Sequence, residues 1–334
     1  MSSLTILAQP PRPPSLAQLV QAQPNRVALG NDVGCVGYYA ATVGREGPPL
    51  VLLHSINAAA SSNEMRPLFE AFRDRQIYAL DWPGFGLSDR GPRAYTPALY
   101  AEALTRFLRT VAAPGGEPVD IVALSLSSEV AARVAVQSRA LVRSLVLLSP
   151  TGLSEVPARP QRLHRTLDAF AKSRLASELF FSLLTTRPAI RHYLKKSFYG
   201  PVDEDLAEHA YLSARAPGAR FAPLAFLRGS LSTPNAYFEL YQQLKVPTFV
   251  LYDRDAYTSF ERLPQLTRLN PFVRALRVEP TQGLPHFEQG TQVELALRAF
   301  YDSIEITDLV EHRIDTVPLP DHLPLPTLHA LASS

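Results

Sequence analysis

Short apolar runs recur along the chain, and most are followed by a stretch of helical periodicity. The runs cover residues 49–54, 77–82, 119–125, 142–149, 248–252 and 272–278. Apolar runs of this length without polar alternation are typical of strands buried on both faces. Helices are expected near residues 63–74, 96–112, 127–138 and 291–300. This order predicts an α/β fold with a mostly parallel twisted sheet and right-handed crossovers.

Two regions depart from this alternation. Residues 26–43 contain short apolar groups separated by turn-forming residues such as Gly30 and Gly34, which predicts an antiparallel edge to the sheet. From about residue 151 to 245 the strand-like runs disappear, and residues 163–184 and 189–198 have helical character. We therefore expect flanking helices around the sheet and an inserted helical lid.

These patterns divide the chain into five segments. They are an extended Pro-rich arm (1–24), the first part of an α/β core (25–151), a helical lid insertion (152–245), the second part of the core (246–303) and a Pro-rich C-terminal tail (304–334). The prolines of the arm and the tail lack the backbone N–H that helices and sheet ladders need.

Composition narrows the class of protein. Among 334 residues 46% are hydrophobic, 19% are charged and the net charge is +2, as in a globular protein without a broad basic face. Nucleic acid is therefore not an expected partner. The single cysteine, Cys35, cannot form an internal disulfide.

With no basic start before an apolar run, and no apolar stretch of membrane-spanning length, we expect a soluble, cytoplasmic protein without stable membrane insertion.

One serine stands where an apolar strand is expected to turn into a helix. Ser125 ends the run 119–125, and small residues, Ala123 and Ser127, lie two positions away on either side. A nucleophile at a sharp strand-to-helix turn needs such small neighbours, because the backbone bends tightly there. The alternative is that Ser125, Ser127 and Ser128 simply cap the helix, as serines often do.

The chain resembles the α/β-hydrolase family from about Arg26 to Phe300. The most specific motif is the complete Asp-x-Pro-Gly-x-Gly-x-Ser stretch at 81–88, for which we predict a structural role in shaping a turn. The family's Gly-x-Ser-x-Gly elbow stands here as residues 123–127, with Ala123 and Ser127 in place of glycine. Its His-Gly pair stands as His54-Ser55. Ala123 and Ser127 in place of glycine bear on the width of the elbow, and Ser55 in place of glycine bears on the width of the loop that would supply an oxyanion donor.

The resemblance implies a catalytic triad in the chain order Ser125, Asp255, His286. Ser125 would be the nucleophile, His286 the general base and Asp255 the acid that orients it, with Asp253 as the rival acid. The backbone N–H groups of Leu126 and Ile56 are the positional candidates for an oxyanion hole. No cofactor and no metal ion are expected.

The reaction predicted on this basis is hydrolysis of a small to medium, largely apolar ester through an acyl-enzyme intermediate. Carbon–carbon bond hydrolysis, thioester hydrolysis and cofactor-free haloperoxidation use the same triad in this family and stay open, as does a non-catalytic binding role. Basic clusters at 187–191 and 195–196 would suit an acidic substrate or a membrane surface, or form a solvated helix face. A small-molecule substrate is the expected partner, and the oligomeric state is left open.

Overall fold

The computed structural model describes residues 22–42, 44–45, 47–155 and 174–316. The chain divides into two compact units, residues 1–295 and 296–334. The sheet and all the candidate site residues belong to the first unit. Of the predicted segments, the Pro-rich arm up to residue 21, residues 156–173 of the insertion and the tail from residue 317 lie outside the described residues.

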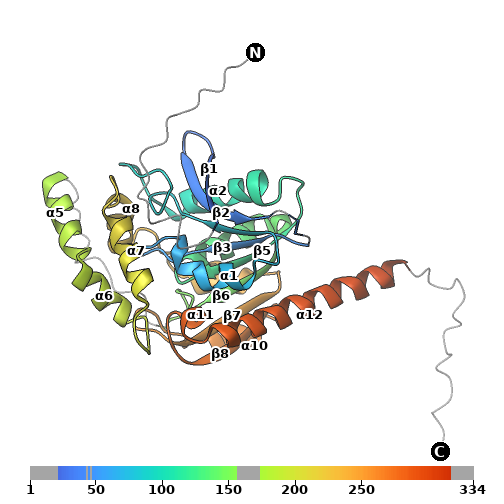
Figure 1. Cartoon of the computed structure of the whole chain (residues 1–334). Coiled ribbons are helices and arrows are strands. Elements are labelled where there is room, and N and C mark those ends of the chain that lie inside the picture. The colour runs from blue at the N-terminus through green and yellow to red at the C-terminus, as the bar shows by residue number, and fades with distance from the viewer. Residues whose placement is uncertain (1–21, 43, 46, 156–173, 317–334) are drawn as a thin grey trace, which may run out of the picture. The chain divides into compact units, whose positions relative to one another are not determined.

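Eight strands form one sheet in the order β1-β2-β4-β3-β5-β6-β7-β8 (Figure 1). Their bounds are β1 Gln23–Ala28, β2 Cys35–Ala41, β3 Leu50–Leu53, β4 Ile77–Leu80, β5 Val119–Leu124, β6 Val142–Leu148, β7 Thr248–Arg254 and β8 Val273–Gln282. Strand β2 is antiparallel to both β1 and β4, whereas all pairs from β4 to β8 are parallel. The predicted mostly parallel sheet with an antiparallel N-terminal edge is confirmed.

Helices α1 Arg66–Ala71, α2 Pro97–Phe107 and α3 Ser127–Gln137 connect parallel strands, and α12 Gly290–Thr316 follows the last strand, as the sequence pattern predicted. The short helices α10 Leu263–Leu269, between β7 and β8, and α11 Pro285–Glu288, after β8, were not predicted. Helix α2 begins where expected because Thr96 accepts a hydrogen bond from the Leu99 N–H and Pro97 occupies the first helical position.

Helix α12 is longer than its predicted end near Phe300. It continues through residues 304–316, which were assigned to the Pro-rich tail. The physical reason is local, because the first proline or glycine after Gly290 is Pro318. The proline-rich composition of the tail therefore begins later than its boundary at residue 304 suggested.

The described chain between β6 and β7 is helical. It contains α5 Arg174–Leu184, α6 Arg187–Lys195, α7 Glu204–Ala214, α8 Phe221–Leu227 and α9 Ala236–Glu239. Helices α5 to α8 gather on one side of the sheet (Figure 1). Two polar contacts tie α7 to the loops after β3 and β4: Ser61 Oγ lies 3.0 Å from His209 Nδ1, and Arg90 donates to the Ser213 carbonyl. Helix α7 is thus fixed beside the ends of these strands.

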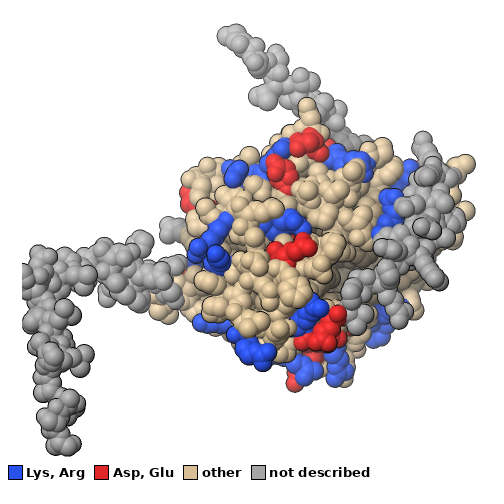
Figure 2. Space-filling model, turned by 180° about the vertical axis from the view of Figure 1, so that it is seen from behind, with Lys and Arg blue, Asp and Glu red and all other residues tan. Residues whose placement is uncertain are grey.

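The centre of the sheet is sealed from solvent. Every residue of β3, β4 and β5 is buried, as expected for strands covered on both faces. On the face shown in Figure 2, basic and acidic side chains are interspersed among uncharged ones. Within the described residues, no helix combines the length and the apolar character needed to cross a bilayer.

Candidate active site

Ser125 lies directly after β5 in a strained conformation. Its φ is 55°, in the left-handed region that residues with a Cβ rarely adopt. Its N–H donates to the Leu148 carbonyl across 2.9 Å, which fixes the backbone against β6. No side chain caps α3, and in the described part of the chain the Ser125 hydroxyl has no hydrogen-bond partner. The strained backbone and the unbonded hydroxyl favour the nucleophile-elbow interpretation over a helix cap.

Ser127, which replaces the second glycine of the elbow, is part of a buried hydrogen-bonded cluster. Its hydroxyl donates to the His54 carbonyl and accepts from the Trp82 indole N–H across 2.8 Å. Trp82 Nε1 also lies 3.1 Å from the same carbonyl, and the His54 Nε2 atom accepts from the Trp82 backbone N–H. The cluster ties together the carboxyl ends of β3, β4 and β5. His54 thus has its contacts within the scaffold.

Two backbone N–H groups beside this cluster are free. Among the described residues, neither the Ile56 N–H, on the loop after β3, nor the Leu126 N–H, before α3, has a hydrogen-bond partner. Both residues are almost fully buried. Because buried backbone N–H groups are nearly always paired, two free ones next to strand ends are the donors that a ligand oxygen could use.

His286 lies in α11, close to the carboxyl ends of β7 and β8, and is 1% exposed. Its Nε2 atom donates to the backbone carbonyl of Glu64 across 2.6 Å, and its Nδ1 atom has no partner among the described residues. A carbonyl oxygen can only accept, so Nε2 carries the hydrogen in this arrangement. The ring packs edge-on against Phe287, which in turn contacts Phe198 of the insertion.

The two rival carboxylates have different environments. Asp253, inside β7, pairs with Arg277 and accepts from the Thr281 N–H, so both of its oxygens are occupied. Asp255 follows β7, and its Oδ1 atom accepts hydrogen bonds from the backbone N–H groups of Tyr257 and Thr258. Its Oδ2 atom would lie 3.1 Å from a Cβ added to Gly283, three residues before His286.

Burial shifts the proton affinities of these groups. It lowers the pKa of His286 to about 4, an effect partly offset by the hydrogen bond to Glu64. Burial also raises the pKa of Asp255 to about 6, partly offset by the N–H groups of Tyr257 and Thr258. Above pH 6 the arrangement therefore contains a neutral imidazole and an ionised carboxylate.

The three predicted triad residues lie near the carboxyl ends of strands, along one edge of the sheet. Among the described residues no hydrogen bond links the side chains of Ser125, Asp255 and His286. Their catalytic roles stay predictions.

Comparison with known proteins identifies the family of this chain. A model of the alpha/beta hydrolase family matches residues 50–294, which is most of the chain. The chain belongs to the α/β hydrolase family. A search of curated protein sequences gives no significant match.

Solved α/β hydrolase structures share the fold at low sequence identity. A serine hydrolase involved in carbazole degradation, the CarC enzyme, has a TM-score of 0.68 and 20% identity over 84% of this chain and 99% of that one. Carboxylesterase CesB from Bacillus subtilis has a TM-score of 0.62 and 18% identity over 86% and 94%. The meta-cleavage product hydrolase CumD has a TM-score of 0.63 and 16% identity over 84% and 98%.

The family's Asp81–Ser88 turn makes contacts that hold the backbone. Asp81 accepts from the N–H groups of Ser62 and Leu87, and Ser88 donates to the Asp81 carbonyl. A Cβ on Gly86 would lie about 2 Å from the Asp81 carboxylate, so only glycine fits there. These contacts are those of a turn-shaping motif.

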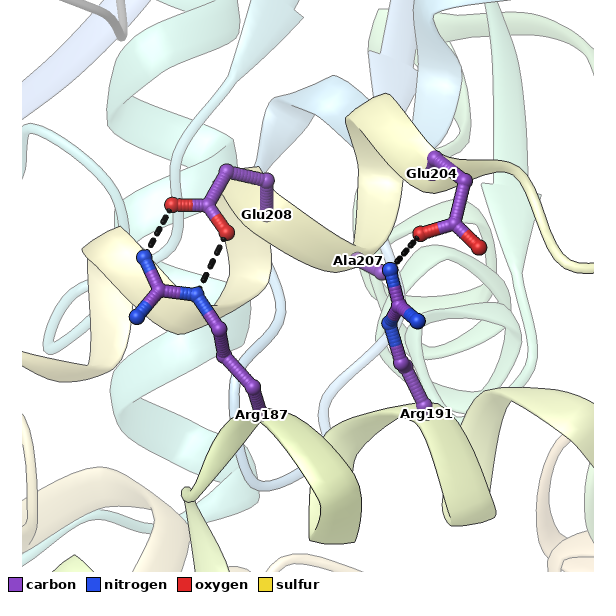
Figure 3. A pocket seen from close by; sticks show the side chains of 5 residues that line it. All are labelled: Arg187, Arg191, Glu204, Ala207 and Glu208. Carbon is purple, nitrogen blue, oxygen red and sulfur yellow. Dashed lines mark hydrogen bonds and ion pairs between the residues drawn. The ribbon is translucent and has the colours of Figure 1, made fainter.

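The basic cluster on α6 is paired with α7. Arg187 makes a two-pronged ion pair with Glu208, and Arg191 pairs with Glu204, around a cavity of about 30 Å³ (Figure 3). The positive charges of these arginines are balanced by the two glutamates, so the arginines are poor candidates for binding an acidic substrate. In the described residues, no group of three or more His, Cys, Asp or Glu side chains has a geometry that could hold a metal ion.

Sequence reasoning missed Glu64 in this α/β hydrolase. Its carboxylate accepts from the Ser55 N–H and from the Asn57 amide, both across 2.8 Å, while its carbonyl accepts from His286. The only signal in the sequence is an acidic residue shortly after the run of small residues 58–62, which does not reveal these contacts.

Proposed function

We propose that the protein is a serine hydrolase that cleaves a small to medium, largely apolar ester through an acyl-enzyme intermediate. The observation that carries this proposal is Ser125, held at a φ of 55° between β5 and α3, with a hydroxyl that has no hydrogen-bond partner in the described part of the chain. A strained serine at this turn is the arrangement that exposes a nucleophile at the edge of an α/β-hydrolase sheet. The two free N–H groups of Ile56 and Leu126 support the same proposal.

In the proposed reaction, Ser125 Oγ attacks the ester carbonyl carbon while His286 Nε2 takes the hydroxyl proton. The carbonyl oxygen becomes an oxyanion that accepts from the N–H groups of Ile56 and Leu126. His286 then gives the proton to the alkoxide leaving group as the carbon–oxygen bond breaks. Water attacks the resulting acyl-Ser125 by the same route and releases the acid.

This sequence requires His286 to change its hydrogen bonding. Nε2 must leave the Glu64 carbonyl and lose its hydrogen, while Nδ1, which has no partner, must gain one. Asp255 is the acid we propose to receive the Nδ1–H, because its Oδ2 atom is close to Gly283 and accepts no hydrogen bond, whereas Asp253 is occupied by Arg277. The aromatic rings of Phe287 and Phe198 beside His286 support an apolar substrate.

The second candidate is a non-catalytic protein that kept the fold to bind a ligand. The observation that favours it is the occupied Nε2 of His286, which cannot act as a base while it donates to Glu64.

Hydrolysis assays distinguish the two candidates. Wild type, Ser125→Ala and the control Ser138→Ala, at the other end of α3, are assayed with p-nitrophenyl esters of increasing acyl length. The proposal predicts turnover by wild type and by Ser138→Ala, and a kcat loss of roughly 10⁴-fold or more in Ser125→Ala. Equal rates for all three proteins would contradict it. Parallel assays with thioesters and with a carbon–carbon bond substrate identify the reaction subtype.

A further inference from the structure

Glu64 is a buried carboxylate that contacts the predicted oxyanion loop. It lies in the short 3₁₀ turn Ser62–Met65 and is 6% exposed. Oε2 accepts from the Ser55 N–H and Oε1 accepts from the Asn57 Nδ2 atom, each across 2.8 Å. A buried acidic group needs such donors, since an unpaired charge away from water is costly.

The two donors flank Ile56, one residue on either side. Asn57 also donates to Ser55 Oγ across 2.7 Å, and its Oδ1 atom accepts from the Ala59 N–H across 2.8 Å. The loop from Ser55 to Ala59 is therefore held on both sides of Ile56, whose own N–H bonds to none of the residues that the structure describes. The direction of that N–H is set by the position of its neighbours, and these are held by the Glu64 carboxylate.

The backbone of the same residue contacts the predicted base. The Glu64 carbonyl accepts from His286 Nε2, so one residue links the oxyanion loop through its side chain and the imidazole through its main chain. Any displacement of the 3₁₀ turn would move both contacts together.

We propose that Glu64 is a positioning residue of the hydrolytic site, whose carboxylate aims the Ile56 N–H at the developing oxyanion. This inference rests on the proposed function. A glutamine could not replace the carboxylate, because two donors point at it and a glutamine side chain has only one acceptor oxygen. Misdirecting one oxyanion donor weakens transition-state stabilisation more than substrate binding.

A donor–acceptor exchange tests the assignment. Glu64→Gln leaves one loop donor unpaired, and Asn57→Asp sets two carboxylates against each other. The double variant restores a full set of pairs, since the new amide can donate to the new carboxylate while its oxygen accepts the Ser55 N–H. Glu70→Gln is the matched control, because Glu70 is exposed on α1 and has no partner among the described residues.

Each protein is assayed for kcat and KM on the best ester and for the rate of Ser125 labelling by a fluorophosphonate. We expect Glu64→Gln to lower kcat and the labelling rate about 10- to 100-fold with KM nearly unchanged. Glu70→Gln should behave as wild type, and the double variant should recover most of the lost kcat. A double variant as slow as Glu64→Gln, or a Glu64→Gln variant as fast as the control, overturns the role of Glu64 while leaving the proposed function intact.

Two further outcomes are also decisive. If Glu64→Gln does not fold, Asn57→Ala removes the loop bond to Glu64 together with the bonds to Ser55 Oγ and from the Ala59 N–H, and leaves Glu64 in place. A wild-type kcat in that variant overturns the assignment. A wild type that neither turns over nor labels overturns the proposed function and this inference with it.

Discussion

Ser125 and Ser149 lie side by side at the carboxyl ends of β5 and β6, and both have a positive φ, 55° and 42° respectively. The register pairs Leu124 with Leu148 immediately before them, and the Ser125 N–H donates to the Leu148 carbonyl. Two neighbouring non-glycine residues with left-handed backbone conformations are strained, and strained residues of this kind cluster at functional sites. This relationship marks the edge of the sheet where the candidate site lies.

Ser125→Gly is expected to stabilise the protein while abolishing hydrolysis. Glycine adopts a positive φ without the clash of a Cβ, so the unfolding free energy should rise by about 1 kcal/mol relative to Ser125→Ala, which keeps the Cβ. Both variants lose the hydroxyl, so they differ in strain and not in chemistry. Denaturant unfolding of the two variants measures the difference, and an alanine variant at least as stable as the glycine variant would show that Ser125 is not strained.

Ser127→Ala is expected to destabilise the fold. The change removes the bond from the Trp82 indole to Ser127 Oγ and the bond from Ser127 to the His54 carbonyl, all inside the buried cluster at the ends of β3, β4 and β5. The unfolding free energy should fall by about 1–3 kcal/mol. Chemical denaturation compares it with Ser138→Ala, and equal midpoints for the two variants would contradict the structural role of Ser127.

Stability should fall as the pH is lowered from about 6.5 to about 4. Burial lowers the pKa of both His286 and His209 from 6.5 to about 4, so in this range the unfolded chain binds protons that the folded protein does not. Each histidine contributes a loss of up to about 3 kcal/mol. Stability contributed by these groups is fully present above pH 6.5 and is lost below it.

The variant His209→Asn isolates one of the two contributions. An asparagine can still bond Ser61 Oγ, which lies 3.0 Å from His209 Nδ1, but it does not titrate. Unfolding free energies measured across the range should decline less steeply in this variant than in wild type. Parallel curves for the two proteins would show that His209 is not buried in its neutral form.

Asp255→Asn is expected to be more stable than wild type and less active. Burial raises the pKa of Asp255 to about 6 from 3.8, so the folded protein loses stability as pH rises through 6 and the carboxyl ionises. Above pH 7 the neutral amide should raise the unfolding free energy by about 1–2 kcal/mol, a value reduced because the side chain is partly exposed. The amide oxygen can still accept from Tyr257 and Thr258.

The same variant should be much slower than wild type, because an amide cannot stabilise the imidazolium of His286. The activity of wild type should decline as the pH falls through about 6, where Asp255 becomes protonated. Thermal melts and pH–rate profiles measure both effects. A slow Asp253→Asn variant beside a fully active Asp255→Asn variant would instead make Asp253 the acid.

The sequence predicted the fold because its hydrophobic runs are local and unambiguous. Strand β5 coincides with the run 119–125 to within one residue, and the turn residues around Gly30 and Gly34 separate β1 from β2 as expected. The predicted end of α12, near Phe300, falls short of the observed end. The helix continues to Thr316 because its sequence contains no breaker before Pro318.

The positions of the candidate site residues were predictable only where they depend on chain order, and their catalytic roles stay predictions. Ser125 and Asp255 follow strands, so the pattern indicates one edge of the sheet for both, whereas their grouping with His286 came from the resemblance to the family. The contacts of Glu64 with Ser55 and with His286 join residues far apart in the sequence or across a loop that folds back, and no periodicity encodes them. The same is true of Ser127, whose bonds to Trp82 and His54 exist only once three strands are aligned.

The most direct test of this account is to locate the residue modified by a fluorophosphonate. Wild type and Ser125→Ala are incubated with the probe, and intact mass and peptide mapping then identify the adduct. We expect one adduct on wild type, on the peptide that contains Ser125, and none on Ser125→Ala. An unlabelled wild type, or an adduct at another residue that persists in Ser125→Ala, would contradict it.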